Sequence, residues 1–157
     1  MSFTLPVSIV ARVLFLVATS LAAAAPARAA TPVDVPARIQ AMAEATTRAT
    51  AAIAERQART LTKLTEMDAA NRPNSAIVAA GRAGKRAVEE AAERGRKQVR
   101  KIAVTTITQL RRQNADAALI AQVEAARDAD VASITQAAVT AKSAITAKVT
   151  EITGSAG

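Results

Sequence analysis

The side chains that most often carry out enzymatic chemistry are scarce in this sequence. Its 157 residues include no histidine and no cysteine, so it lacks an imidazole for proton transfer, a thiolate nucleophile and the usual nitrogen and sulfur metal ligands. Glu89 and Glu93 lie one helical turn apart and could share a cation, but the basic residues around them favour ion pairing. Asp128 and Asp130 diverge on a helix. Three serines also lack a credible activating base: Ser75, Ser133 and Ser143. We therefore predict a protein that is not an enzyme, with no catalytic, cofactor-binding or metal-binding residues.

A dense group of basic residues lies between positions 82 and 112, where only three glutamates accompany it. At 100° per residue these basic side chains fall on the half of a helix opposite a stripe of glycines, so we expect them to point outward. Arg111 and Arg112 extend the group at its end. The expected anion-contact face consists of Arg82, Lys85, Arg86, Arg94, Arg96, Lys97, Arg100 and Lys101.

Two interpretations of this basic face remain open. It is either a solvated surface that keeps a helix soluble, or a footprint for a polyanion such as anionic lipid headgroups, an envelope polysaccharide or nucleic acid. Nucleic acid is the weakest of these partners, because the chain after residue 30 has no aromatic ring on which a base could stack.

Three segments of similar length carry the three-to-four spacing of apolar residues that is typical of helices, and no stretch alternates with period two. We expect helices at about 34–71, 75–112 and 116–153. Asp34 caps the first helix, with Pro36 tolerated in its first turn, and Pro73 separates the first two helices, with Asn74 or Ser75 available to cap the second. The second break, at residues 113–115, has no proline or glycine. It is predicted from charge, because basic residues 111–112 suit a helix C-terminus and an acidic residue 116 suits an N-terminus.

Each segment has a stripe of residues that should face a core. The first stripe is Ile39, Met42, Thr46, Ala49, Ile53, Thr60, Leu64 and Met67. The second is Ile77, Gly81, Gly84, Val88, Ala91, Gly95, Val99, Ile102, Thr106 and Leu110. The third is Leu119, Ile120, Val123, Ala126, Val131, Ile134, Ala138, Ala141, Ile145, Val149 and Ile152. Each glycine costs about 1 kcal/mol against alanine inside a helix, so the three glycines indicate close approach of a neighbouring helix, or else a hinge or a self-association seam.

The predicted fold is all-α, an elongated antiparallel three-helix bundle or coiled coil, with helices about 55 Å long. Because its core is rich in alanine and threonine, we expect marginal stability of the monomer or oligomerisation. If consecutive helices are antiparallel neighbours, acidic residues of one helix lie at the same height along the bundle axis as basic residues of the next, in both helix pairs. The expected partners are Arg56 and Arg59 with Glu89, Glu90 and Glu93, and Asp128 and Asp130 with Lys97 and Arg100.

Residues 1–30 have the pattern of a secretory signal peptide. Arg12 precedes an apolar run at residues 13–25, and the small-residue triplet Ala27-Arg28-Ala29 follows it, so cleavage near Ala29 or Ala30 is expected. An anchor that is retained is the alternative, although the apolar run is short for a membrane span. Residues 31–157 would then form an exported alanine-rich helical domain, without disulfides or a lipidated cysteine.

These features together predict a secreted or periplasmic, non-enzymatic helical structural or interaction protein that self-associates. Its partners would be a second copy or another helical protein, and its basic middle helix would dock on an anionic envelope component, either lipid or polysaccharide. The alternative is a peripheral lipid-binding protein that applies its amphipathic helices directly to anionic membranes.

Overall fold

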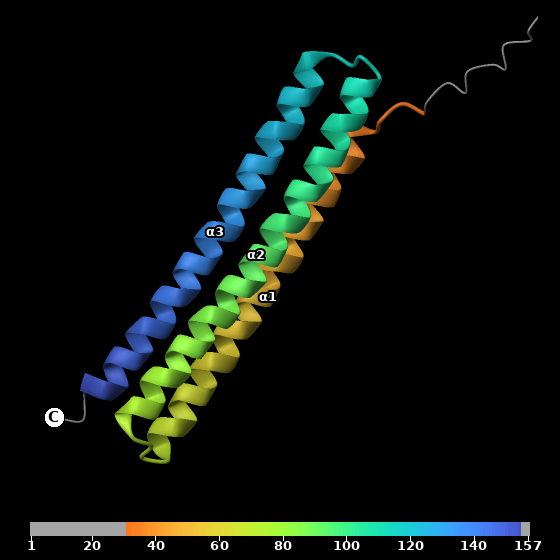
Figure 1. The fold of residues 1–157 in the computed structure, drawn as a ribbon. Helices are drawn as coiled ribbons and strands as arrows, with labels where there is room; N and C mark the ends of the chain where they lie inside the picture. Colours follow the sequence, from red (N-terminus) through yellow and green to blue (C-terminus); the bar gives the residue numbers. More distant parts are fainter. Residues whose placement is uncertain (1–30, 155–157) are drawn as a thin grey trace, which may run out of the picture. The chain divides into compact units, whose positions relative to one another are not determined.

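A computed structural model describes residues 31–154, which form the three helices α1 (Val35–Ala69), α2 (Asn74–Arg112) and α3 (Ala117–Gly154) (Figure 1). The three helices lie side by side, and each packs against both others. This architecture confirms the predicted all-α three-helix bundle, and each helix ends within two residues of its predicted boundary. The predicted signal peptide at residues 1–30 and the tail at 155–157 lie outside the described residues.

Both connections are tight turns that depend on an asparagine. Asn71 and Asn114 have φ values of 47° and 51°, in the left-handed region where asparagine can replace glycine. At the first turn the backbone N–H of Arg72 donates to the carbonyl of Met67 at 2.9 Å. At the second, the N–H of Ala115 donates to the carbonyl of Leu110 at 3.0 Å. The helices α1 and α2 therefore each end in a Schellman motif, and each connection reverses the chain within four residues.

The helix starts agree with the sequence in two cases. The carboxylate of Asp34 accepts a hydrogen bond from the N–H of Ala37 at 3.0 Å, and Asp116 accepts one from Ala118 at 2.9 Å. The helix α2 differs, because its cap residue is Pro73 and no side chain caps it. The expected capping by Asn74 or Ser75 is therefore wrong, since Pro73 fixes an extended backbone one residue before the helix.

The core runs the length of the bundle. Its largest fully buried apolar side chains are Met42, Ile53, Leu64, Ile77, Leu110, Ile134, Ile145, Val88, Val99 and Val123, and all belong to the predicted stripes. Val35 and Ala45 are also buried, although the predicted stripe of the first helix omitted them. Leu119, which the third stripe included, is 38% exposed.

The three stripe glycines serve close helix packing within one molecule. A β-carbon at Gly84 would overlap the side chain of Thr60, and one at Gly95 would overlap the β-carbon of Ala49, so both glycines bring α2 close to α1. Gly81 faces Val149 of α3 in the same way. The interpretation as close approach is therefore confirmed, and the stripe is buried rather than available as an outer seam.

Candidate anion-binding surface

The outward face of α2 carries most of the unneutralised positive charge in the described chain. The helix contains ten basic and three acidic residues, and all three glutamates are already engaged. Glu89 pairs with Arg96 and Lys142, Glu90 with Arg94, and Glu93 with Arg96. Within residues 31–154, seven exposed basic side chains of α2 have neither an ion-pair nor a hydrogen-bond partner: Arg82, Arg86, Lys97, Arg100, Lys101, Arg111 and Arg112.

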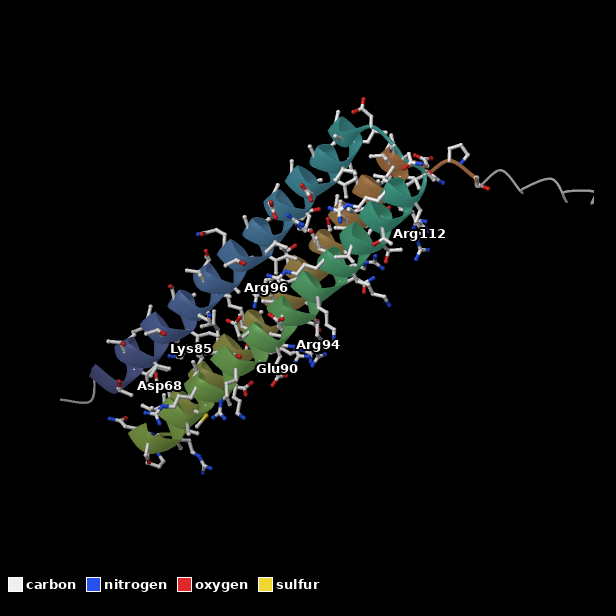
Figure 2. The ribbon with its side chains drawn as sticks, turned by 45° about the horizontal axis from the view of Figure 1, so that its top comes forward. Asp68, Lys85, Glu90, Arg94, Arg96 and Arg112 are labelled. Atoms are coloured by element: carbon white, nitrogen blue, oxygen red, sulfur yellow. The ribbon has the colours of Figure 1, made fainter. Side chains whose placement is uncertain are left out.

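Arg96 differs from the other residues of the expected anion-contact face. Its guanidinium donates to Glu89 at 2.7 Å and to Glu93 at 2.9 Å, and its side chain is only 12% exposed. The hydrogen bond with Glu89 is the main cause that raises the pKa of Arg96. In Figure 2, Arg96 and Lys85 lie on the side of α2 that faces α3, whereas Arg94 and Arg112 lie on the other side. Arg96 is therefore part of the bundle's own ion-pair network.

The carboxylate of Glu89 joins α2 to α3. It accepts hydrogen bonds from the Nζ of Lys142 on α3 and from Arg96 on its own helix. These hydrogen bonds, first from Lys142 and then from Arg96, lower the pKa of Glu89 below its ordinary value of 4.5. Beside it, Lys85 donates to the hydroxyl of Thr146 at 3.3 Å.

Three residues of the anion-contact face meet at one place. Arg82, Lys85 and Arg86 line a hollow of about 440 Å³, together with Glu89 and Lys142. Four cationic groups here surround one carboxylate that is already paired, so the hollow has an excess of positive charge. Lys97, Arg100 and Lys101 lie farther along the same helix and do not reach this hollow.

We expected ion pairs between residues that lie at the same height on neighbouring helices. These ion pairs do not form among the described residues. Arg59 pairs with Glu55 on its own helix, and Asp128 accepts hydrogen bonds from its neighbour Arg127 at 2.9 and 3.1 Å. Glu89 faces α3, whereas Arg56 of α1 lies at the groove between α1 and α2, on the other side of α2. The prediction is wrong because an equal level along the axis does not place two side chains on facing sides.

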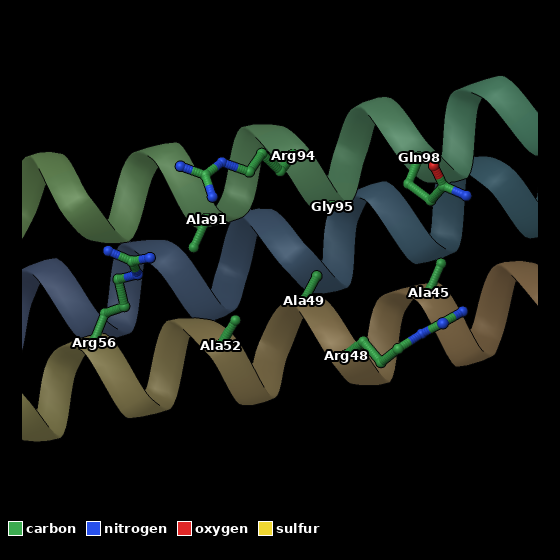
Figure 3. Close-up of a pocket in the computed structure, with 9 residues that line it drawn as sticks. All are labelled: Ala45, Arg48, Ala49, Ala52, Arg56, Ala91, Arg94, Gly95 and Gln98. Atoms are coloured by element: carbon green, nitrogen blue, oxygen red, sulfur yellow. The ribbon is translucent and has the colours of Figure 1, made fainter.

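A second basic feature is a groove between α1 and α2 that the sequence analysis missed. It measures about 310 Å³ and is lined by Ala45, Arg48, Ala49, Ala52, Arg56, Ala91, Arg94, Gly95 and Gln98 (Figure 3). Alanines and a glycine form its floor, and three arginines from two helices form its rim. The signal that could have found it is the spacing of Ala45, Ala49 and Ala52 beside Arg48 and Arg56.

The fold and this surface define an all-α three-helix bundle with one strongly basic helix face. No family model, curated protein or solved structure matches the chain. None of the helices described in residues 31–154 is long and apolar enough to span a membrane. The same residues contain no cluster of three or more acidic side chains suited to a metal ion.

Proposed function

We propose that this protein is an exported, non-enzymatic helical interaction protein that self-associates and docks through the outward face of α2 on an anionic component of the cell envelope. The observation that carries the docking proposal is the set of unpartnered basic side chains on α2. Because the glutamates of this helix are already paired, seven cations are left to interact with solvent or with a partner.

The spread of these cations favours an extended polyanion over a compact ligand. Arg82 and Arg112 are separated by 30 positions on one helix, which corresponds to about 45 Å at 1.5 Å per residue. A membrane surface or a charged polysaccharide can contact the whole row at once, and each contact adds to the attraction. Exposed charges of this kind are screened by salt, so the binding should weaken as the ionic strength rises.

One further observation favours an anionic lipid surface within this proposal. Val104 is 59% exposed and follows Arg100 and Lys101 by about one turn of α2. Basic residues beside an exposed apolar side chain are the combination that holds a helix at a lipid interface. The closed bundle could dock in this way without exposing its core.

The alternative function, in which amphipathic helices lie directly on the membrane, would require the bundle to open. The apolar side chains of all three helices fill the shared core. Hydrogen exchange measured on anionic vesicles separates the two modes. Amides of the core helices should stay protected if the closed bundle docks, and should lose protection if the helices separate.

Co-sedimentation of residues 31–157 tests the docking. The probes are vesicles of phosphatidylcholine with or without phosphatidylglycerol, and dextran sulfate as a soluble polyanion. The test variant changes Arg86, Lys97, Arg100 and Lys101 to Gln. The control variant changes Arg38, Arg59, Lys63 and Arg72 to Gln, which removes the same number of exposed charges away from α2.

We expect the wild-type protein and the control to bind anionic vesicles at low salt, and the test variant to lose that binding. Binding to dextran sulfate alone would assign the face to a polysaccharide. If the wild-type protein binds neither probe, or if both variants bind equally, the docking proposal fails. Export is tested separately, because the intact mass of the protein recovered from cells should begin at Ala30 or Thr31.

A further inference from the structure

The groove between α1 and α2 has an apolar floor and a charged rim. Ala45, Ala49 and Ala52 of α1 face Ala91 and Gly95 of α2 across it. These small side chains leave space for another helix to lie close to both helices, since the distance between packed helices depends on the side chains at the contact. Figure 3 looks into this groove, and α3 lies behind its floor. The groove therefore opens on the side of the bundle away from α3.

The three arginines on the rim of the groove retain much of their capacity to bind a carboxylate. Arg48 donates its Nε to the backbone carbonyl of Glu44 at 3.2 Å. Arg94 has one contact with Glu90 at 3.5 Å, and both side chains are mostly exposed. Arg56 has no ion-pair partner among residues 31–154. An acidic helix that entered the groove would therefore meet three arginines, none of which is held in a buried ion pair.

The outward face of α3 has the complementary chemistry. Ala121, Ala125, Asp128 and Ala132 are exposed and follow one another at intervals of four, three and four residues, the same intervals that separate Ala45, Ala49, Ala52 and Arg56. No charged residue occurs from position 131 to 141. Val139, which is 47% exposed, lies on the same face, because it follows Ala132 by seven residues, or about two helical turns. This face combines small residues with one acidic group, and in the described molecule no helix covers it. Asp128 pairs with its neighbour Arg127 at 2.9 Å, but its side chain is 70% exposed, so its carboxylate stays accessible to a partner.

We propose that the groove between α1 and α2 of one molecule binds the outward face of α3 of a second copy, with Arg48, Arg56 and Arg94 directed at the carboxylate of Asp128. This inference rests on the proposed self-association and names its two surfaces. Because the groove and the outward face of α3 lie on opposite sides of the bundle, the contact is head-to-tail. A second copy bound in this way still offers its own groove, so the assembly grows beyond a dimer, into an open filament or a larger ring.

Sedimentation velocity over a range of protein concentrations tests this arrangement with two variants of residues 31–157. The groove variant carries Arg48→Glu and Arg56→Glu. The α3 variant carries Ala125→Arg and Ala132→Arg. All four side chains are exposed, so circular dichroism should show unchanged helicity. The matched control, Arg38→Glu with Arg72→Glu, reverses two exposed charges outside the groove.

We expect the wild-type protein and the control to increase in mass with concentration and to pass beyond the dimer. Each variant alone should lose self-association by roughly tenfold or more. The groove variant still has an intact α3 face and the α3 variant an intact groove, so an equimolar mixture of the two should form a one-to-one complex and nothing larger.

Three results would overturn the inference about the interface: self-association of either variant at the wild-type level, a mixture that stays monomeric, or a wild-type protein that stops at a closed dimer. A wild-type protein that remains monomeric at every concentration would remove both this interface and the proposed self-association. The vesicle experiment would still stand in that case, because it measures docking of α2 independently.

Discussion

Glu89 of α2 and Lys142 of α3 form an ion pair between two helices near the middle of the bundle. The same carboxylate accepts a hydrogen bond from Arg96 at 2.7 Å, so two cations hold one anion. The side chain of Glu89 is 45% exposed, and water therefore screens both interactions. The arrangement links α2 to α3 and engages Arg96 and Lys142 in ion pairs within the bundle.

Changing Glu89 to Gln should lower the free energy of unfolding by about 0.5–1 kcal/mol, because Glu89 has two partners but both ion pairs are partly exposed. Glu90→Gln is the control, since Glu90 contacts only the exposed Arg94, at 3.5 Å, and its loss should change stability by less than about 0.5 kcal/mol. Urea unfolding followed by circular dichroism measures both variants. Equal stability of the two variants would contradict the assigned role of Glu89.

The contribution of Glu89 should also depend on pH. Its pKa is lower in the folded protein than the ordinary value of 4.5, so its stabilisation is complete above that value and is lost as the pH falls through the lowered folded pKa. We therefore expect the difference in stability between the wild-type protein and Glu89→Gln to be present at neutral pH and to shrink as the pH falls below 4.5. A difference that grows on acidification would contradict this assignment.

The fold could be predicted from the sequence because its signals are local and repeated. The spacing of apolar residues predicted the three helices, and Pro73 predicted the first turn. The second turn followed from the charges beside Gln113, although Asn114 supplies the backbone conformation that a glycine usually provides. Exposure at the ends of helices was harder to predict. Leu119 fits the third stripe but lies in the first turn of α3, where less of the bundle covers it.

The candidate site could be predicted only in part. Periodicity was enough to place Arg82, Arg86, Lys97, Arg100 and Lys101 on the exposed side of α2. It could not show that the Arg96 side chain turns toward two glutamates, because that choice depends on rotamers and on Lys142 from another helix. The groove was missed for the same reason, since it exists only where two helices lie side by side.

Gly95→Ala should destabilise the bundle. Alanine favours the helix by about 1 kcal/mol, but the added methyl group would overlap the β-carbon of Ala49, which is fixed to the backbone and cannot rotate away. Overpacking of this kind costs about 1–3 kcal/mol, so we expect a net loss in urea unfolding. Gly154→Ala is the control, because nothing lies within 4 Å of its added methyl group. A gain in stability at Gly95 would show that α1 and α2 can move apart freely.

Asn114 should tolerate glycine but not alanine. Its φ of 51° costs an ordinary residue about 1–2 kcal/mol, whereas glycine adopts it freely. We expect Asn114→Ala to lower the melting temperature and Asn114→Gly to keep or raise it. If both variants melted at the same temperature, the turn would not depend on the left-handed conformation.

Thr46→Val should stabilise the protein. Thr46 is 8% exposed, and within residues 31–154 its hydroxyl oxygen is buried without a hydrogen-bond partner. Valine has nearly the same shape and removes the unpaired group, so the free energy of unfolding should rise by about 1 kcal/mol. Thr106→Val is the matched control, because the buried hydroxyl of Thr106 donates to the carbonyl of Ile102 at 2.8 Å and its removal also removes a hydrogen bond. Urea unfolding of both variants should therefore show a gain at Thr46 alone, and a loss at Thr46 as large as that at Thr106 would mean that the Thr46 hydroxyl is paired in solution.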